Sequence, residues 1–407
     1  MTLFANDGSP PKAGAAAHSV HLDAMRGLAA LAVVAFHVRL LFFVARSQIA
    51  PDLRSAASDS FYLATGLGRE AVLAFFVLSG FLIATSVHRD GLLSRRLIGR
   101  YAVARLSRLY VVLLPALALG VLWDLLGLHL FPAADIYHGM LANGLFRIDV
   151  AARLQPANVI ATTAFLQAIV FPSPGSSEQF WSLAYEFWCY ALFPLAYLAF
   201  APASRPWLRI STSLAAAVII YLVGTGVFVY FGCWLLGAAI ALAPPAIQRI
   251  FRRYSLVMVA AGVVCALLAL FAIKQYGLRM PGSVFALAVS FALLVAGLAN
   301  SRLLRPSELV WRCYAAAAQW LAQRSFSLYA IHVPLLVFLR AWCGNTLWQP
   351  TETNMALWAV LVGGSLIYAD LNWRLAERHT PVVRRWLLGK FRIAPVRTVP
   401  LPPHSTR

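Results

Sequence analysis

The chain has 407 residues, of which 61% are hydrophobic and only 12% are charged. Together with a mean hydropathy of +0.73, this composition excludes a soluble globular domain and is typical of an all-α polytopic membrane protein. The formal net charge of +19 does not indicate nucleic-acid binding, because the basic residues alternate with hydrophobic runs instead of gathering on one solvated face.

Apolar stretches long enough to cross a bilayer follow one another along the chain. They cover residues 22–45, 70–88, 108–129, 182–201, 209–224, 226–243, 255–273, 281–299, 326–342 and 355–376. The even-numbered connections and the two chain ends hold about 25 of the 34 Lys and Arg residues. The positive-inside rule therefore predicts ten spans with both termini in the cytoplasm. We expect the protein in the cell's inner membrane.

We expect one transmembrane domain at residues 21–380. It is preceded by a polar cytoplasmic tail at 1–20 and followed by a basic, Pro-rich cytoplasmic tail at 381–407, disordered after Arg384. A short re-entrant or interfacial helix is predicted at 158–171, because about 14 residues are too few to cross the membrane.

Two further expectations concern small residues. Gly224 and Gly226 lie where the fifth and sixth spans must be joined by a tight turn. The five cysteines show no C-x-x-C pair, and we interpret them as small buried apolar residues: Cys189, Cys233, Cys265, Cys313 and Cys343.

The first span carries an arginine and a histidine in the stretch RGLAALAVVAFH, Arg26 to His37. Eleven helical steps of about 100° bring both side chains to one face, with a rise of about 16 Å between them. Asp23 is spaced to pair with Arg26, whereas His37 is alone among apolar residues. His37 is therefore either a functional group near mid-membrane or a histidine that hydrogen-bonds to a neighbouring helix.

The second span and the loop after it contain Ser79, Gly80 and an arginine cluster. Small residues in a bulky run let another helix or a ligand approach closely. Arg105 and Arg108 are three residues apart at the inner end of the third span, so both guanidinium groups can converge on one anion. Ordinary positive-inside charge is the alternative interpretation of this pair.

Polar side chains also occur in the fourth and ninth spans. Glu186 follows an aromatic belt and should face protein or water, where it can pair with Arg or His. Tyr329 and His332 are three residues apart, which places a phenol and an imidazole on one helical face. These groups fit acid/base chemistry on a substrate or a proton relay in a transporter, and their spacing does not decide between the two.

The order of these segments resembles the membrane-bound acyltransferase-3 family. The motifs that carry the resemblance read LDAMRGLAALAVVAFH, FFVLSGFLI, RLSR, WSLAYEFWCYALFP and SFSLYAIHVPL, and they cover nearly the whole chain. A late LNWRLAERHTP resembles the family's closing pattern, but an extra residue before Pro381 weakens any role for Glu377.

The resemblance implies an O-acyltransferase that moves an acyl group, usually acetyl, from cytoplasmic acyl-CoA to a sugar hydroxyl of a glycan or a glycosylated metabolite. It implies catalytic roles for His37, Arg26 and Glu186. It also implies that acyl-CoA is bound by a second set of residues: Ser79, Arg105, Arg108, Tyr329 and His332. Acyl-CoA is then a co-substrate, with no metal and no permanently bound cofactor.

Two alternative functions stay open at this point. A transporter or flippase of a glycan or lipid intermediate would use the same polar residues to line a pathway. A non-catalytic partner in a polysaccharide assembly complex would tolerate the loss of His37. The bilayer and a carbohydrate acceptor are the expected partners, and the sequence also allows a homo-oligomer.

Overall fold

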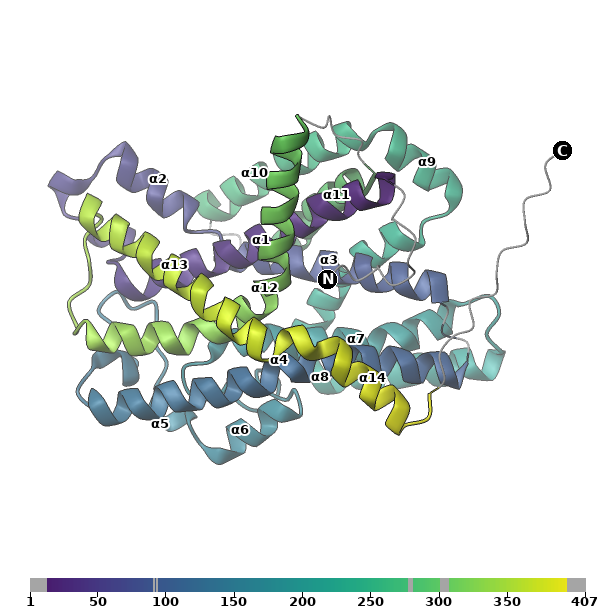
Figure 1. Cartoon of the computed structure of the whole chain (residues 1–407), viewed down its shortest axis with the longest axis horizontal. Coiled ribbons are helices and arrows are strands. Elements are labelled where there is room, and N and C mark those ends of the chain that lie inside the picture. The colour runs from purple at the N-terminus through teal and green to yellow at the C-terminus, as the bar shows by residue number, and fades with distance from the viewer. Residues whose placement is uncertain (1–12, 91, 93, 277–280, 301–306, 394–407) are drawn as a thin grey trace.

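The computed structural model describes residues 13–90, 92, 94–276, 281–300 and 307–393, and these ranges contain helices and loops but no strand. Nine helices in the described part are long and apolar enough to cross a membrane, which confirms the all-α multi-pass prediction (Figure 1). The long helices are α1 (Ala13–Phe42), α3 (Gly68–Asp90), α4 (Arg95–Leu130), α7 (Trp181–Phe200), α8 (Pro206–Leu242), α10 (Ser255–Tyr276), α11 (Pro281–Asn300), α12 (Glu308–Trp342) and α13 (Glu352–Leu375). The shorter helices are α2 (Ala56–Ala64), α5 (Val150–Arg153), α6 (Pro156–Thr163), α9 (Pro245–Arg253) and α14 (Thr380–Lys390).

Helix α8 contains both the fifth and the sixth predicted span. It begins beside the end of α7 and reaches the start of α7 where Gly226 lies against Tyr185. It then returns toward the middle of α7, where the rings of Trp234 and Phe193 are 4.7 Å apart. The reversal occurs at Gly224, whose φ of 84° is accessible to glycine without a steric penalty. The number of membrane crossings stays a prediction.

Helices α1 and α12 pack along each other at the centre of the bundle, and α3, α4 and α13 surround them (Figure 1). Most of α12 between Arg324 and Pro334 is buried, including Ser325, Ser327 and His332. A buried polar group that finds no partner is costly, so these side chains need partners inside the protein. Those partners define the candidate site described below.

The long connection between α4 and α7 folds onto one end of the bundle. Within it, the predicted helix at 158–171 is confirmed only as far as Thr163, where α6 ends. Phe165 has a positive φ of 56° and its carbonyl oxygen accepts a hydrogen bond from Trp188, so the chain turns instead of continuing as a helix. Further along, Ser176 donates to both carboxylate oxygens of Asp124, at 2.7 and 2.8 Å, which fixes this connection to α4.

Three local expectations were wrong. Of the arginines expected in a loop before the third span, Arg89 lies on α3, and the others lie on α4, which begins at Arg95. The C-terminal tail is helical through Lys390, because α14 packs on α4; residues 394–407, like residues 1–12, lie outside the described part. Of the cysteines, two are buried, but three are exposed on the protein surface: Cys265, Cys313 and Cys343. An apolar side chain on a membrane protein can face lipid as well as protein.

The predicted orientation can be tested by cysteine labelling. Ser94 is exposed at the start of α4, and Met140 is 61% exposed in the connection at the opposite end of the bundle. In a chain whose native cysteines are replaced by alanine, Ser94→Cys should react with a membrane-impermeant maleimide only after the cells are permeabilised. Met140→Cys should react in intact cells. Labelling of Ser94→Cys in intact cells would overturn the orientation.

Candidate active site

A pocket lies at the end of the bundle that contains Arg26, Arg105 and Arg108, which we call the arginine end. It encloses about 830 Å³ of space, part of it open to the surroundings. Helices α1, α3, α4, α7 and α12 supply its walls. Besides the three arginines, the lining residues are Val72, Phe75, Phe76, Leu78, Ser79, Leu82, Ile83, Ser182, Leu183, Glu186, Tyr190, Ser325, Phe326 and Tyr329.

Arg105 and Arg108 converge on this pocket from α4, as their spacing predicts. The guanidinium carbon of Arg105 lies 5.7 Å from the Tyr101 ring and 6.0 Å from the Tyr190 ring, and that of Arg108 lies 5.5 Å from the Phe326 ring. Aromatic rings hold the guanidinium planes without neutralising their charge. The Nε atom of Arg105 is buried and has no hydrogen-bond partner among the described residues. The Nε–H group of Arg105 is therefore available to an anion.

Arg26 lines this end of the pocket, and the carboxylate of Glu377 interacts electrostatically with Arg26 and Arg108. Arg26 donates to Asp23 at 3.1 Å, as predicted, and interacts electrostatically with Arg108 and Glu377. The Glu377 carboxylate accepts hydrogen bonds from the backbone N–H and the hydroxyl of Ser327, at 3.1 and 2.7 Å. The extra residue before Pro381 weakened the expectation of a role for Glu377, and the structure places its carboxylate beside Ser327 on α12.

Glu186 lies in the wall of the pocket and is bound by hydroxyl groups. It accepts hydrogen bonds from Ser79, at 3.2 Å, and from Tyr190. Trp234 of α8 in turn donates to the Ser79 hydroxyl at 3.3 Å. Pairing with Arg or His, which we expected for Glu186, is not seen among the described residues. Ser79 and Glu186 thus form one polar unit across α3 and α7 in the wall of the pocket.

Gly80, next to Ser79, has a packing role. A Cβ atom at Gly80 would overlap the backbone carbonyl oxygen of Trp234, and one at Gly237 would overlap that of Val77. The two glycines therefore let the backbones of α3 and α8 touch, as small residues do in membrane helix pairs. This contact also holds Trp234 against Ser79.

Replacing Gly80 by alanine should lower stability, because the clash is with backbone and cannot be relieved by a rotamer change. Overpacking of this kind costs about 1 to 3 kcal/mol. We expect a lower apparent melting temperature of the purified protein in detergent. Gly363→Ala on α13 is the matched control, since its Cβ would have no neighbour within 4 Å. Equal melting temperatures for both variants would contradict this account of the α3–α8 contact.

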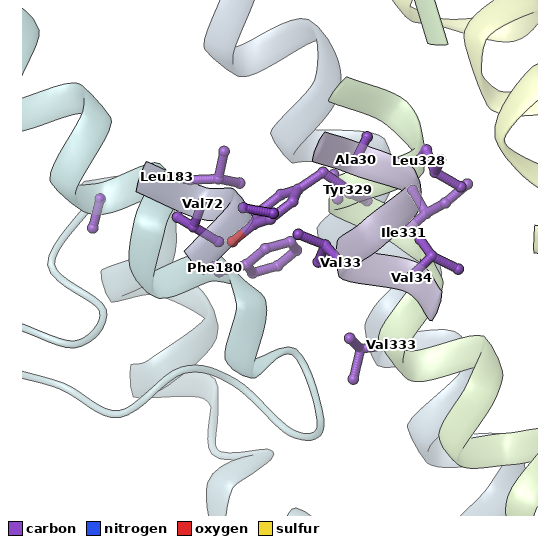
Figure 2. Close-up of a cluster of buried hydrophobic side chains, with 14 of the residues drawn as sticks. Ala30, Val33, Val34, Val72, Phe180, Leu183, Leu328, Tyr329, Ile331 and Val333 are labelled. Carbon is purple, nitrogen blue, oxygen red and sulfur yellow. The ribbon is translucent and has the colours of Figure 1, made fainter. Parts of the chain in front are cut away.

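The pocket ends at a layer of packed apolar side chains, which we call the apolar layer: Val33, Val72, Phe180, Leu183 and Tyr329. Figure 2 shows the Tyr329 ring among these residues. The Tyr329 hydroxyl is fixed by Ser182, at 2.6 Å, and donates to the Gln179 carbonyl oxygen at 3.1 Å. Val72, Leu183 and Tyr329 line the pocket, whereas the two histidines one helical turn further along α1 and α12 do not.

Beyond the apolar layer, His37 and His332 form a hydrogen-bonded pair. The Nδ1 atom of His37 lies 3.0 Å from Nε2 of His332. Each ring also contacts a backbone carbonyl oxygen one turn earlier on its own helix at 2.9 Å, Val33 for His37 and Leu328 for His332. His332 is fully buried, while His37 is partly exposed. Packing of α1 against α12 therefore joins two side chains that are almost 300 positions apart in the sequence.

The carbonyl contacts favour one assignment of the protons in this pair when both rings are neutral. A carbonyl oxygen only accepts, so Nδ1 of His332 carries a proton and donates to Leu328. In the neutral ring Nε2 of His332 is then an acceptor, and Nδ1 of His37 donates to it and to Val33. This assignment leaves Nε2 of His37 with a free lone pair. His37 is thus prepared to act as a base through that nitrogen.

The sequence assignments can now be compared with these positions. Arg26, Ser79, Arg105, Arg108, Glu186 and Tyr329 all line the pocket. His332, which we grouped with the acyl-CoA contacts, lies beyond the apolar layer and contacts His37 instead. Although it shares a helical face with Tyr329, the i+3 spacing carries it one turn past the end of the pocket. Among the described residues, no group of three His, Cys, Asp or Glu side chains could hold a metal ion.

Two acyltransferases are similar to this chain over most of its length. The chain is 27% identical to the acyltransferase MdmB of Streptomyces mycarofaciens, over 94% of this chain and 95% of that protein. It is 22% identical to the peptidoglycan O-acetyltransferase OatA of Listeria monocytogenes, over 91% of this chain but only 57% of that protein. No solved structure matches at a comparable level of significance. A family model described as an acyltransferase domain matches residues 20–371, so the chain belongs to the acyltransferase-3 family and is an acyltransferase.

Proposed function

We propose that this membrane acyltransferase moves an acyl group, acetyl in the simplest case, from acyl-CoA to a sugar hydroxyl. The donor binds in the pocket at the arginine end, on the cytoplasmic side of the inner membrane. The acceptor hydroxyl meets the acyl group at His37. Family membership favours this function over a transporter, and the name of OatA supports a carbohydrate acceptor, here a glycan or a glycosylated metabolite.

The arginines support an acyl-CoA donor. CoA carries several phosphate charges at one end and its thioester at the other. Arg105 and Arg108 present their guanidinium groups from neighbouring turns of α4, an arrangement suited to phosphate oxygens. Arg26, which also lines the pocket, and Glu377, which interacts with it electrostatically, can position the polar atoms of the pantetheine arm. The thioester then points up the pocket toward Glu186 and the apolar layer.

The histidine pair supports general base catalysis. Nε2 of His37 takes the proton from the acceptor hydroxyl while the oxygen attacks the thioester carbonyl carbon. The C–S bond then breaks, and the departing CoA sulfur takes up the proton held by His37. In a two-step alternative, Nε2 of His37 attacks first and carries the acyl group to the acceptor. In both versions the thioester arm must pass the apolar layer, so the side chains around Tyr329 must move.

The single observation that carries the proposal is the alignment of an arginine-lined pocket with a histidine whose Nε2 is free. It is tested with the purified protein in lipid vesicles, acetyl-CoA labelled in the acetyl group, and a panel of soluble sugars and glycan fragments. Label should appear on a sugar oxygen, with one free CoA thiol formed per transfer. If the protein consumes no acetyl-CoA and no longer acyl-CoA with any of the acceptors, the donor assignment is wrong.

His332 should act as a positioning residue, because it accepts the Nδ1 proton of His37. His332→Leu removes the acceptor and should slow transfer by roughly fivefold to tenfold, the equivalent of one hydrogen bond. His332→Gln can offer an amide oxygen near the lost Nε2 and should retain more activity. The comparison uses transfer rates across a pH range at equal amounts of folded protein. Equal rates for the leucine and glutamine variants would mean that His332 only fills space.

A further inference from the structure

The region of the chain beyond the matched family domain brings additional positive charge to the mouth of the pocket. Helix α14 lies beside the first part of α4, and Ile393, just after α14, contacts Gly99 (Figure 1). This packing places the charge of Arg384 close enough to act on Arg105 and on Arg100. Arg105 lines the pocket, so Arg384 extends the basic surface outward from it.

The positive charges of Arg384 and Arg105 are not balanced by a carboxylate of the protein in the described ranges. Arg384 forms no ion pair with a carboxylate there, and the Nε atom of Arg105 is buried without a partner. Burial and the neighbouring guanidinium groups lower the pKa of Arg384 from its usual value. Holding unpaired like charges together is unfavourable in the absence of an anion. The cluster is therefore suited to a ligand with more than one negative charge.

We propose that Arg384 and Arg105 bind the 3′-phosphate on the adenosine of acyl-CoA. This inference depends on the proposed function, because the thioester end must enter the pocket and the nucleotide end must then stay at its mouth. The diphosphate, closer to the pantetheine arm, is left to Arg108 and the inner part of the pocket. The 3′-phosphate is a monoester with a charge near −2 at neutral pH, which matches a cluster of several arginines.

The test compares acetyl-CoA with 3′-dephospho-acetyl-CoA. The wild-type protein is purified into vesicles of phosphatidylcholine alone. Its KM for the dephospho donor should be roughly tenfold higher than its KM for acetyl-CoA, because the dephospho donor lacks a charge-assisted hydrogen bond. Arg384→Gln should raise the KM for acetyl-CoA toward that of the dephospho donor and leave the dephospho value unchanged. Arg249→Gln is the matched control, since Arg249 is an exposed arginine on α9, another short basic helix.

Each outcome has a distinct meaning. If neither donor is used, the proposed function fails. If the wild-type protein uses both donors equally well, the 3′-phosphate site is wrong while the function stands. The same cluster could instead bind the phosphates of anionic lipids. In that case Arg384→Gln would keep the preference for acetyl-CoA, and adding phosphatidylglycerol would change the activity of the wild-type protein but not of the variant, which overturns the assignment to CoA.

Discussion

His37→Ala should slow acyl transfer by at least about 100-fold, the low end of the effect expected when a general base is lost. The hydrogen bonds of the histidine pair place a proton on Nδ1 of His37 and leave Nε2 as the free base. Alanine offers no group that can accept the hydroxyl proton. Transfer is measured with purified protein in lipid vesicles and normalised to folded protein, and acyl-CoA binding should persist because His37 does not line the pocket.

The control for this experiment is His129→Ala, which removes an exposed histidine near the end of α4. It should leave transfer unchanged. Incubation of the wild-type protein with labelled acetyl-CoA but no acceptor distinguishes the two chemical routes, because only an acyl-histidine intermediate would label the protein. Near wild-type turnover by His37→Ala would mean that His37 only packs between helices. His332 would then have no positioning role either.

Arg105→Ala and Arg108→Ala should each weaken acyl-CoA binding by about 1.5 to 3 kcal/mol, the usual contribution of a hydrogen bond to a charged group. The effect should fall on the donor, since both arginines line the pocket and neither contacts the histidine pair. Lysine at either position should restore only part of the affinity, because an ammonium group cannot form the planar, two-pronged contact of a guanidinium.

Affinity for a non-hydrolysable acyl-CoA analogue, measured by calorimetry in detergent, is the direct readout. Arg249→Ala on α9 again serves as the control for a general loss of positive charge. The KM for the acceptor should stay within about twofold in both pocket variants. Unchanged donor affinity in both would remove the arginine pair from the donor site and leave it as a determinant of membrane orientation.

Much of the pocket was predictable because it depends on local geometry. The three-residue spacing of Arg105 and Arg108 fixes their common direction on any helix, and both line the pocket. Arg26 pairs with Asp23 for the same reason. The bilayer also limits where a charged side chain can be placed, so Glu186 had to face the protein interior, as it does.

The rest of the site depends on contacts between distant segments. Nothing in the local sequence around His37 or His332 indicates that the two rings meet, because the contact arises from the packing of α1 against α12. The position of Glu377 was also not predictable from its own motif, because its carboxylate is held by Ser327 on another helix. The three exposed cysteines show a further limit, since apolar character alone does not tell a lipid-facing position from a buried one.

The apolar layer has a consequence for the energy metabolism of the cell. If the pocket faces the cytoplasm and His37 is reached from the opposite side, an open, water-filled passage between them would conduct protons and discharge the membrane potential. A constriction of apolar side chains blocks such conduction by excluding water. Tyr329, with its hydroxyl held by Ser182 and Gln179, is the largest side chain of this layer. Small residues in its place, as in Tyr329→Gly, should make proteoliposomes leak protons even without any substrate.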